Sequence, residues 1–320
     1  MTPQGRSSNP SGISPNIPEQ ALQHVDCGIC GSAESEQKFQ DGAFFVVTCK
    51  ECAVTYVTPR LLDASLIESV YDESYWNSSA AKVHGYSDYC GDAELYKRTY
   101  RNRLAIVHRH FTSNQREDGT PRRVLDVGCA AGYFLSVIRD DGWDISGLEP
   151  SDAIRSSAIR ELGEENVRGG LLGVADGLEE GSFDLVTFWD VIEHIPDPRA
   201  ALRRAAELLT PDGVLIVETQ DVSSRTAAVL GKKWHHYKHA EHIYHFNKQT
   251  LTALLESAGF ETLENSGRLG GKYVTFSFVA ERVGRIHPLL SFLSSPLRLF
   301  GNKSFYVNLF DEMIVVAKQR

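Results

Sequence analysis

Four of the six cysteines form two close pairs whose spacing could bind a metal ion. The pairs are Cys27 with Cys30 and Cys49 with Cys52, and eighteen residues separate them. Four thiolates at this spacing are typical of a structural zinc site, which leaves the ion no open position for water. Gly31, directly after the first pair, favours a tight turn. A redox pair or a chance arrangement is the alternative interpretation.

A second group of residues could hold a small cofactor. Val124 to Gly132 reads VLDVGCAAG, in which Asp126 ends a predicted strand. Gly128 and Gly132 let the backbone turn and approach a ligand. A dinucleotide loop would instead show G-x-G-x-x-G around a pyrophosphate. An acid would repel a pyrophosphate but suits the amino-acid end of a cationic sulfonium compound, so the loop favours S-adenosylmethionine over NAD.

Another carboxylate ends the next predicted strand. Glu149 follows GWDISGL, where it could accept hydrogen bonds from both hydroxyl groups of a ribose. In the alternative interpretation, Gly128 and Gly132 serve only tight packing, and Glu149 caps the helix that begins at SDAIRSS. Acids at the ends of consecutive strands favour the cofactor interpretation.

Strands and helices alternate from Arg122 onward. The strands are predicted at RRVLDVG, WDISGLE, NVRGG, FDLVTFWD, GVLIVET and EMIVVAK, with helical segments between most of them. This alternation predicts an α/β fold with a mostly parallel sheet and helices on both faces. The apolar strands lack strict alternation, which suits strands buried on both sides.

The sequence divides into four expected parts. They are a disordered tail at 1–22, a cysteine module of short hairpins at 23–60, a helical and aromatic connector at 61–115, and the main domain at 116–320. Segments 221–246 and 282–308 interrupt the alternation after strands near the expected ligand edge. They are predicted to form substrate lids.

The ordered motifs VLDVGCAAG, GLEPS, FDLVTFWDVIEHIPDP and LTPDGVLIVET resemble those of class I S-adenosylmethionine-dependent methyltransferases, in particular the methyltransferase 11/23-like group. The resemblance implies a Rossmann-like, seven-stranded sheet, here preceded by a small zinc-binding β module of the zinc-ribbon type. It also implies that Asp126, Gly128 and Gly132 surround the methionine part of the cofactor and that Glu149 holds the ribose.

Further positions follow from the same resemblance. Phe188, Trp189 and Asp190 are expected to line the mouth shared by cofactor and substrate. Many relatives place an acid after the third strand to meet the adenine amino group, whereas this sequence has Gly170 and Leu171 there. Adenine is therefore expected to meet Leu171 and backbone groups, with Asp176 as a weaker candidate because it stands further along the chain.

The cysteine-paired start, followed by VTYVTPR and YDESYW, resembles a bacterial group of methyltransferases that act on small molecules. Some members methylate a carbon of nucleotide-linked sugars, but they carry a further C-terminal domain that is not expected in 320 residues. Only the front end matches, so their reaction is not transferred to this chain.

Two histidines are candidate catalytic residues. Methyl transfer is an in-line displacement, and a base is needed only for a poor nucleophile. His194, in WDVIEHIPDP, follows a strand end and is a candidate base or substrate contact, with a hydrogen-bonded structural role as the alternative. The density of histidines in WHHYKHAEHIYHF suggests a metal. Relatives keep only a Glu-His pair and an aromatic there, so we expect a lid in which His242 contacts the substrate.

Residues 288–305 are apolar with few acids. They could lie on a membrane surface or cover a lipid-linked substrate. The alternative interpretations are a docking face within the fold and a contact in a homodimer.

The net charge of −9 disfavours nucleic acid as a partner, because phosphate backbones are bound by basic surfaces. Neither a secretory signal nor an apolar stretch long enough to span a membrane is expected. Paired cysteines that suit a metal point to a reducing compartment, so a cytoplasmic protein is expected.

Three functions compete at this point. The first is a methyltransferase acting on a small molecule such as a sugar, glycan, lipid-linked or secondary-metabolite intermediate. The second is a zinc-ribbon interaction protein with a non-catalytic methyltransferase-like domain. The third, a nicotinamide oxidoreductase, requires a pyrophosphate loop that the sequence lacks.

Overall fold

The structure is a computed structural model of the chain, and it describes residues 21–62, 70–71, 73–77, 88–174, 176–280, 301 and 303–320. The expected tail lies almost wholly outside the described residues, as does most of the late apolar segment at 288–305. Among the described residues, no helix has the length and hydropathy of a membrane-spanning segment.

A seven-stranded sheet forms the centre of the main domain, in the order β12-β15-β10-β9-β6-β7-β8. Five neighbouring strands run parallel, and β15 is antiparallel to both β10 and β12. This confirms the predicted α/β class and the mostly parallel sheet. The strands are β6 (Arg123–Val127), β7 (Asp144–Leu148), β8 (Val167–Arg168), β9 (Phe183–Trp189), β10 (Leu209–Gln220), β12 (Phe260–Ser266) and β15 (Glu312–Gln319).

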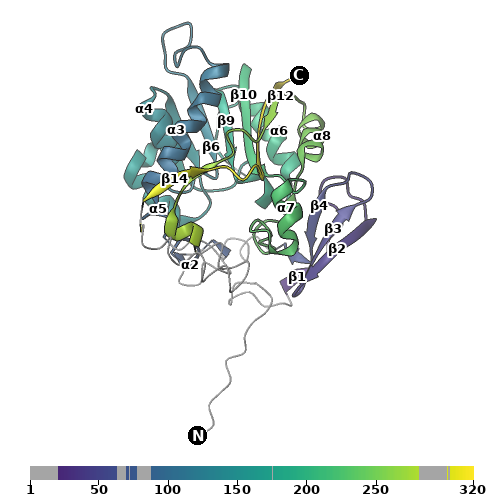
Figure 1. Ribbon diagram of the computed structural model, residues 1–320. Coiled ribbons are helices and arrows are strands. Elements are labelled where there is room, and N and C mark those ends of the chain that lie inside the picture. The colour runs from purple at the N-terminus through teal and green to yellow at the C-terminus, as the bar shows by residue number, and fades with distance from the viewer. Residues whose placement is uncertain are drawn as a thin grey trace.

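Helices cover both faces of this sheet (Figure 1). One face packs against α3 (Ala93–His110), α4 (Tyr133–Asp140) and α5 (Asp152–Leu162). The other packs against α6 (Pro198–Leu208) and α8 (Lys248–Ser257). Each helix has an apolar stripe that the sheet buries, as in α6, where Leu202, Ala205 and Leu208 are fully buried. The short elements are α2 (Glu73–Trp76), α7 (Arg225–Leu230), η2 (Glu164–Asn166), η3 (Ile192–His194) and η4 (Gly231–Lys233).

The N-terminal module is a small antiparallel sheet set to one side of the main sheet, purple in Figure 1. Its strands β2 (Ser35–Asp41), β3 (Phe44–Cys49) and β4 (Thr55–Thr58) pair in sequence. Two short strands, β1 (Leu22–Gln23) and β5 (Arg60–Leu61), pair with each other at its ends. The predicted hairpins are therefore present.

The module receives a fourth strand from far along the chain. β11 (Tyr244–His245) pairs with β4, so that Tyr244 lies opposite Tyr56. The same buried core contains Cys27 and Tyr56 from the module and Leu125 and Phe183 from the central sheet. The module and the main domain consequently share one hydrophobic core.

Segment 221–246 ends as part of that core, since Ile243, Tyr244 and Phe246 belong to it. Trp234, in the middle of the segment, is also almost completely buried. Movement of the segment as a lid stays a prediction. A separate antiparallel pair of strands, which the sequence did not predict, consists of β13 (Lys272–Thr275) and β14 (Ser304–Val307). The second part of segment 282–308 is thus paired with residues just before the segment begins.

Candidate functional site

A cavity of about 2150 Å³ opens at the carboxyl ends of the parallel strands. This is larger than a typical pocket for one small ligand, so it has room for a cofactor and a second molecule. The cavity brings together most of the sequence-predicted site residues. Those that line it are Asp126, Gly128, Glu149, Leu171, Trp189, Asp190, His194 and His242.

The loop after β6 is held in an unusual backbone conformation. Gly128 has a φ of 70°, and the backbone N–H of Gly128 donates to the carbonyl of Leu148 at 2.7 Å. A Cβ atom at Gly128 would lie 2.7 Å from Cγ2 of Val191, too close for a side chain. A glycine is therefore required here by both the backbone angle and the packing.

Gly132 has a different role from the one expected. It precedes α4 with a φ of 77°, and a Cβ atom there would lie 2.5 Å from Cδ1 of Leu162 in α5. Gly132 does not line the cavity. Its position supports the packing interpretation, because the missing side chain lets α4 begin against α5.

Asp126 lies buried at the end of β6. Its Oδ1 accepts a hydrogen bond from Oγ1 of Thr187 at 2.7 Å. Burial raises the pKa of Asp126 to about 8 against the lowering effect of the hydrogen bond from Thr187, with a smaller raising contribution from the charge of Glu149. A cation bound nearby would favour the ionised form of this buried acid.

Glu149 follows β7, and both of its carboxylate oxygens accept backbone hydrogen bonds. Oε2 accepts from the N–H of Ala130 at 2.9 Å, and Oε1 accepts from the N–H of Ser151 at 2.8 Å. Because a carboxylate has about four acceptor positions, two remain for hydroxyl groups. Burial raises the pKa of Glu149 to about 7. Glu149 also steadies the start of α5, so the two interpretations of this residue are compatible.

Phe188 and Trp189 lie on opposite faces of β9, because successive side chains of a strand alternate. Trp189 lines the cavity and packs against Phe134 and Tyr100, with ring centroids 5.1 and 5.8 Å away. Phe188 is fully buried in the core that faces α6 and α8. The structure thus corrects the expected position of Phe188, which does not reach the mouth.

Asp190 has a positive φ of 55° and faces a lysine that the sequence did not suggest. Nζ of Lys272 lies 2.7 Å from Oδ2 of Asp190 and 2.7 Å from Oε1 of Glu312. Lys272 belongs to β13 and Glu312 to β15, so three separate elements meet at one wall of the cavity. No local motif around Lys272 marks this role.

A buried ion pair between Arg103 and Glu218 lies next to this wall of the cavity. Nε of Arg103 in α3 donates to Oε2 of Glu218 in β10 at 2.9 Å, and Nη1 donates to the carbonyl of Gly271 at 3.0 Å. Both side chains are almost completely buried. Arg103 therefore fixes the connector helix, the central sheet and the start of β13 relative to one another.

The segment after β8 supplies Leu171, which is half exposed and lines the cavity. Asp176 is instead turned to Arg204, whose Nε and Nη2 each lie 3.1 Å from the Asp176 carboxylate. Burial opposes ionisation there, but the bonds from Arg204, Gly173 and Leu178 lower the pKa of Asp176 to about 2. Asp176 is thus engaged in a structural ion pair.

His194 ends η3 at the cavity. Its Nδ1 lies 2.9 Å from the carbonyl oxygen of Glu241 and 2.9 Å from Oη of Tyr71. Because a carbonyl only accepts, Nδ1 carries the proton, and Nε2 is the basic nitrogen of the neutral ring. Burial lowers the pKa of His194, which keeps the ring neutral at neutral pH. The bond to residue 241 also gives His194 the structural role considered above.

His242 packs edge-on against His194, with ring centroids 4.7 Å apart. It is buried, and its Nδ1 has no hydrogen-bond partner within the described residues. The other histidines of the segment diverge. His239 lies 3.3 Å from Asp41 in the cysteine module, and His245 Nδ1 lies 3.3 Å from Nε2 of Gln220.

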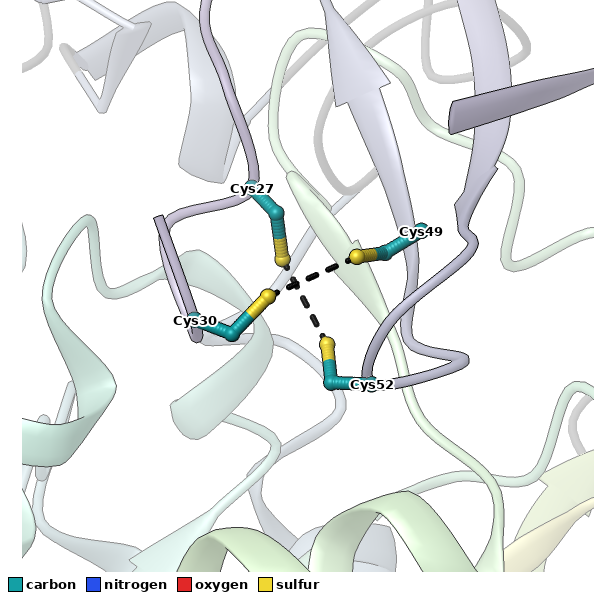
Figure 2. Close-up of side chains that lie close together, drawn as sticks. All are labelled: Cys27, Cys30, Cys49 and Cys52. Carbon is teal, nitrogen blue, oxygen red and sulfur yellow. Dashed lines mark hydrogen bonds between the residues drawn. The ribbon is translucent and has the colours of Figure 1, made fainter. Parts of the chain in front are cut away.

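The four cysteines of the module converge, with their sulfur atoms turned toward a common centre (Figure 2). The Sγ atoms of Cys27 and Cys52 are 3.5 Å apart, as are those of Cys30 and Cys49. These distances exclude disulfide bonds, which require about 2.05 Å. All four atoms lie within 4.8 Å of one another. The predicted four-cysteine cluster is therefore present.

Two matching turns hold the cluster. The N–H of Gly31 donates to the carbonyl of Cys27 at 2.7 Å, and the N–H of Ala53 donates to the carbonyl of Cys49 at 3.1 Å. Gly31 and Ala53 both have positive φ, at 76° and 59°. Burial would raise the pKa of Cys49, but backbone N–H groups of Cys52 and Glu51 lower it to about 7. These backbone groups therefore stabilise the thiolate form of Cys49.

The sheet order, the acid-ended strands and the glycine loop define the class of protein, a Rossmann-like methyltransferase of class I. The chain belongs to the methyltransferase domain family whose pattern matches residues 96–265. It is an S-adenosylmethionine-dependent methyltransferase, and the matched region begins after the cysteine module.

The chain is similar in sequence to curated O-methyltransferases over about half of its length. The chain is 30% identical over 173 residues to the ubiquinone biosynthesis O-methyltransferase of Azorhizobium caulinodans, which covers 51% of this chain and 68% of that protein. It is 31% identical over 162 residues to the enzyme of the same name from Xanthomonas euvesicatoria, covering 46% of this chain and 66% of that protein.

Among solved structures, a possible histamine N-methyltransferase from Thermotoga maritima aligns with a TM-score of 0.49 at 18% identity, covering 79% of this chain and all of that one.

Proposed function

We propose that this enzyme transfers the methyl group of S-adenosylmethionine to a hydroxyl oxygen of a small molecule. One observation carries the proposal: two buried acids at the ends of adjacent strands share a cavity with a neutral histidine. The acids suit the cationic cofactor, and the histidine suits a hydroxyl that must lose its proton. The similarity to O-methyltransferases supports the choice of oxygen.

In this proposal, Asp126 faces the positively charged methionine part and Glu149 accepts the ribose hydroxyls. Gly128 allows the backbone to approach the cofactor. Trp189 and Leu171 supply apolar contacts. All of them line the same cavity.

The reaction is an in-line displacement. A bond forms between the acceptor oxygen and the methyl carbon while the bond from that carbon to sulfur breaks, and S-adenosylhomocysteine leaves as a neutral thioether. The hydroxyl proton passes to Nε2 of His194, because Nδ1 of that ring already carries a proton. His242 packs against the His194 ring and helps to hold its orientation.

The acceptor is expected to have an apolar part. Most large apolar side chains that are exposed in the described chain stand around this cavity, where they could cover such a group. They are Leu62, Leu171, Val174, Val229, Phe278 and Leu309. A lipid-linked or aromatic acceptor fits this rim better than a free sugar.

We further propose that Cys27, Cys30, Cys49 and Cys52 bind a structural Zn²⁺. The sulfur distances and the two matching turns fit a tetrahedral ion held by four thiolates. Such an ion stabilises the sheet that β11 joins, and β11 directly follows His242 and Ile243 in the sequence. The zinc would thus support the cavity wall without taking part in methyl transfer.

The competing proposal is an interaction protein whose methyltransferase-like domain is inactive. Incubation with methyl-labelled S-adenosylmethionine and a panel of phenolic and aliphatic alcohols, followed by mass spectrometry of the products, separates the two. We expect an O-methylated product and S-adenosylhomocysteine in equal amounts. His108→Ala, on the outer surface, is the control variant and should match the wild type. A protein that binds the cofactor but forms no product with any alcohol would refute the proposal of O-methylation.

A further inference from the structure

Three side chains from two distant segments meet at the wall of the cavity. His235 and His236 follow η4, whereas Asp311 directly precedes β15. Nε2 of His235 and Nε2 of His236 each lie 3.8 Å from Oδ2 of Asp311. The three ligand atoms lie within 4.8 Å of one another. Two imidazoles and a carboxylate are ligands that divalent transition metals share.

His236 gives independent support for a bound ion. The residue is only 9% exposed, and Nε2 has no hydrogen-bond partner in the described part of the chain. Leaving a buried polar nitrogen without a partner costs free energy. Oε1 of Glu312 lies 3.6 Å from the same nitrogen. A metal ion at this point would satisfy the nitrogen.

The carboxylate of Asp311 is held in place by a neighbouring side chain. Nε1 of Trp234 donates to Oδ2 of Asp311 at 2.9 Å, and both residues are buried. Hydrogen bonds of this kind orient ligands in metal sites and raise their affinity. Oδ2 retains a second acceptor position, which a metal ion could occupy.

A neighbouring acidic group is already occupied. Asp190, Glu218 and Glu312 also lie close together, but the ammonium of Lys272 is 2.7 Å from two of them, and Arg103 binds the third. Positive charge is therefore present at that group.

We propose that His235, His236 and Asp311 bind a divalent first-row transition-metal ion at the cavity wall. All three residues line the cavity, so the ion keeps an open position on that side. Three protein ligands with one open position are typical of metal sites that bind a substrate. This site is separate from the four-cysteine cluster and contains no sulfur.

The role of the ion toward the acceptor rests on the proposed function. An oxygen of the acceptor would occupy the open position, where the ion would orient it and lower the pKa of a bound hydroxyl. Metal binding itself is independent of methyl transfer. A test that reports on the ion alone therefore distinguishes a failure of this proposal from a failure of the proposed O-methylation.

Titration of the purified full chain with Co²⁺, followed by visible absorption, tests the site. Cobalt bound by nitrogen and oxygen gives visible bands without the strong near-ultraviolet band of cobalt thiolates. We expect about one Co²⁺ per chain with this sulfur-free spectrum. His235→Ala and Asp311→Asn should each weaken binding at least tenfold.

The control is His108→Ala, which removes an exposed histidine 2.9 Å from Asp141 and so deletes a surface pair of the same chemistry. It should bind Co²⁺ as the wild type does. Because His235 is partly exposed, its variant is expected to fold, and S-adenosylmethionine binding checks that it has. Absence of a sulfur-free spectrum, or equal binding by wild type and His235→Ala, would overturn the proposal.

Discussion

Oε2 of Glu149 accepts a hydrogen bond from the backbone N–H of Ala130 at 2.9 Å. This bond links the residue that ends β7 to the loop that follows β6. Ala130 has a positive φ of 48°, which a non-glycine residue adopts only when its surroundings hold it. The carboxylate proposed to hold the ribose thus also shapes the loop proposed to hold the methionine part.

Cofactor affinity is expected to rise with pH. Burial raises the pKa of Asp126 to about 8 and that of Glu149 to about 7 in the free protein. The cationic cofactor requires the ionised carboxylates, so affinity should fall as pH falls through this range, by roughly tenfold per unit between the two pKa values and by roughly a hundredfold per unit below both. Calorimetric titration at pH 6 and pH 8.5 measures the effect. Equal affinity at both values would contradict it.

The same two acids affect the stability of the free protein in the opposite sense. Their pKa values in the folded protein exceed those in the unfolded chain, so their stabilising contribution is complete below about pH 4. It is lost as pH rises through about 7 to 8. We therefore expect the rise in Tm caused by S-adenosylmethionine to be larger at pH 8.5 than at pH 6, as thermal unfolding would show.

Replacing His194 with alanine is expected to lower kcat by roughly 10² to 10⁴, the usual effect of losing a general base. The Kd for S-adenosylmethionine should stay within about twofold, because Asp126 and Glu149 are unchanged. His194→Gln keeps a polar side chain and should be equally slow. A kcat near the wild-type value in both variants would assign His194 a purely structural role.

The cysteine cluster should be essential for the fold of the module. Cys49→Ser is expected to reduce the zinc content from about one per chain and to lower Tm, since metal binding is coupled to folding. Metal analysis by mass spectrometry of freshly purified protein gives the content. A wild-type protein that contains no zinc, or a Cys49→Ser variant with the same Tm as the wild type, would contradict this prediction.

The two turns of the cluster offer a matched pair of substitutions. Ala53 and Gly31 both have positive φ, and a Cβ at Gly31 would meet no atom within 4 Å. Ala53→Gly should therefore stabilise the protein by about 1 kcal/mol, and Gly31→Ala should destabilise it by about the same amount. Chemical denaturation measures both. Changes of the same sign would contradict the strain argument.

Arg103→Met should destabilise the protein by about 3 kcal/mol, because it leaves the buried carboxylate of Glu218 without its main partner. Adding Glu218→Gln should recover much of the loss. The exposed pair Arg101 and Glu94 serves as the control, since Arg101→Met should cost less than about 1 kcal/mol. Urea unfolding of the three variants provides the comparison.

Features that depend on short sequence patterns could be predicted. The acids at the ends of β6 and β7 and the paired cysteines are each defined by a few consecutive residues, and the structure places the two acids in one cavity and the four cysteines in one cluster. The alternation of strands and helices likewise predicted the central sheet. Local patterns succeed here because the parallel strands all end at the same edge.

Features that depend on contacts between distant parts of the chain could not be predicted from the sequence. Lys272 reaches Asp190 from β13, which carries no motif, and β11 joins a sheet nearly two hundred residues earlier in the chain. Phe188 shows a third limit, because nothing in FDLVTFWD specifies which face of a fully buried strand each side chain takes. Burial on both faces removes the alternation that would have placed it.

Calorimetric titration with S-adenosylmethionine at pH 8.5 tests the central claim most directly, by comparing the wild type with Glu149→Ala and the surface control His108→Ala. The cofactor site described above predicts one cofactor per chain for wild type and control, and a Kd at least tenfold weaker for Glu149→Ala. A wild type that does not bind the cofactor, or a folded Glu149→Ala variant that binds it equally well, would contradict the assignment of this site.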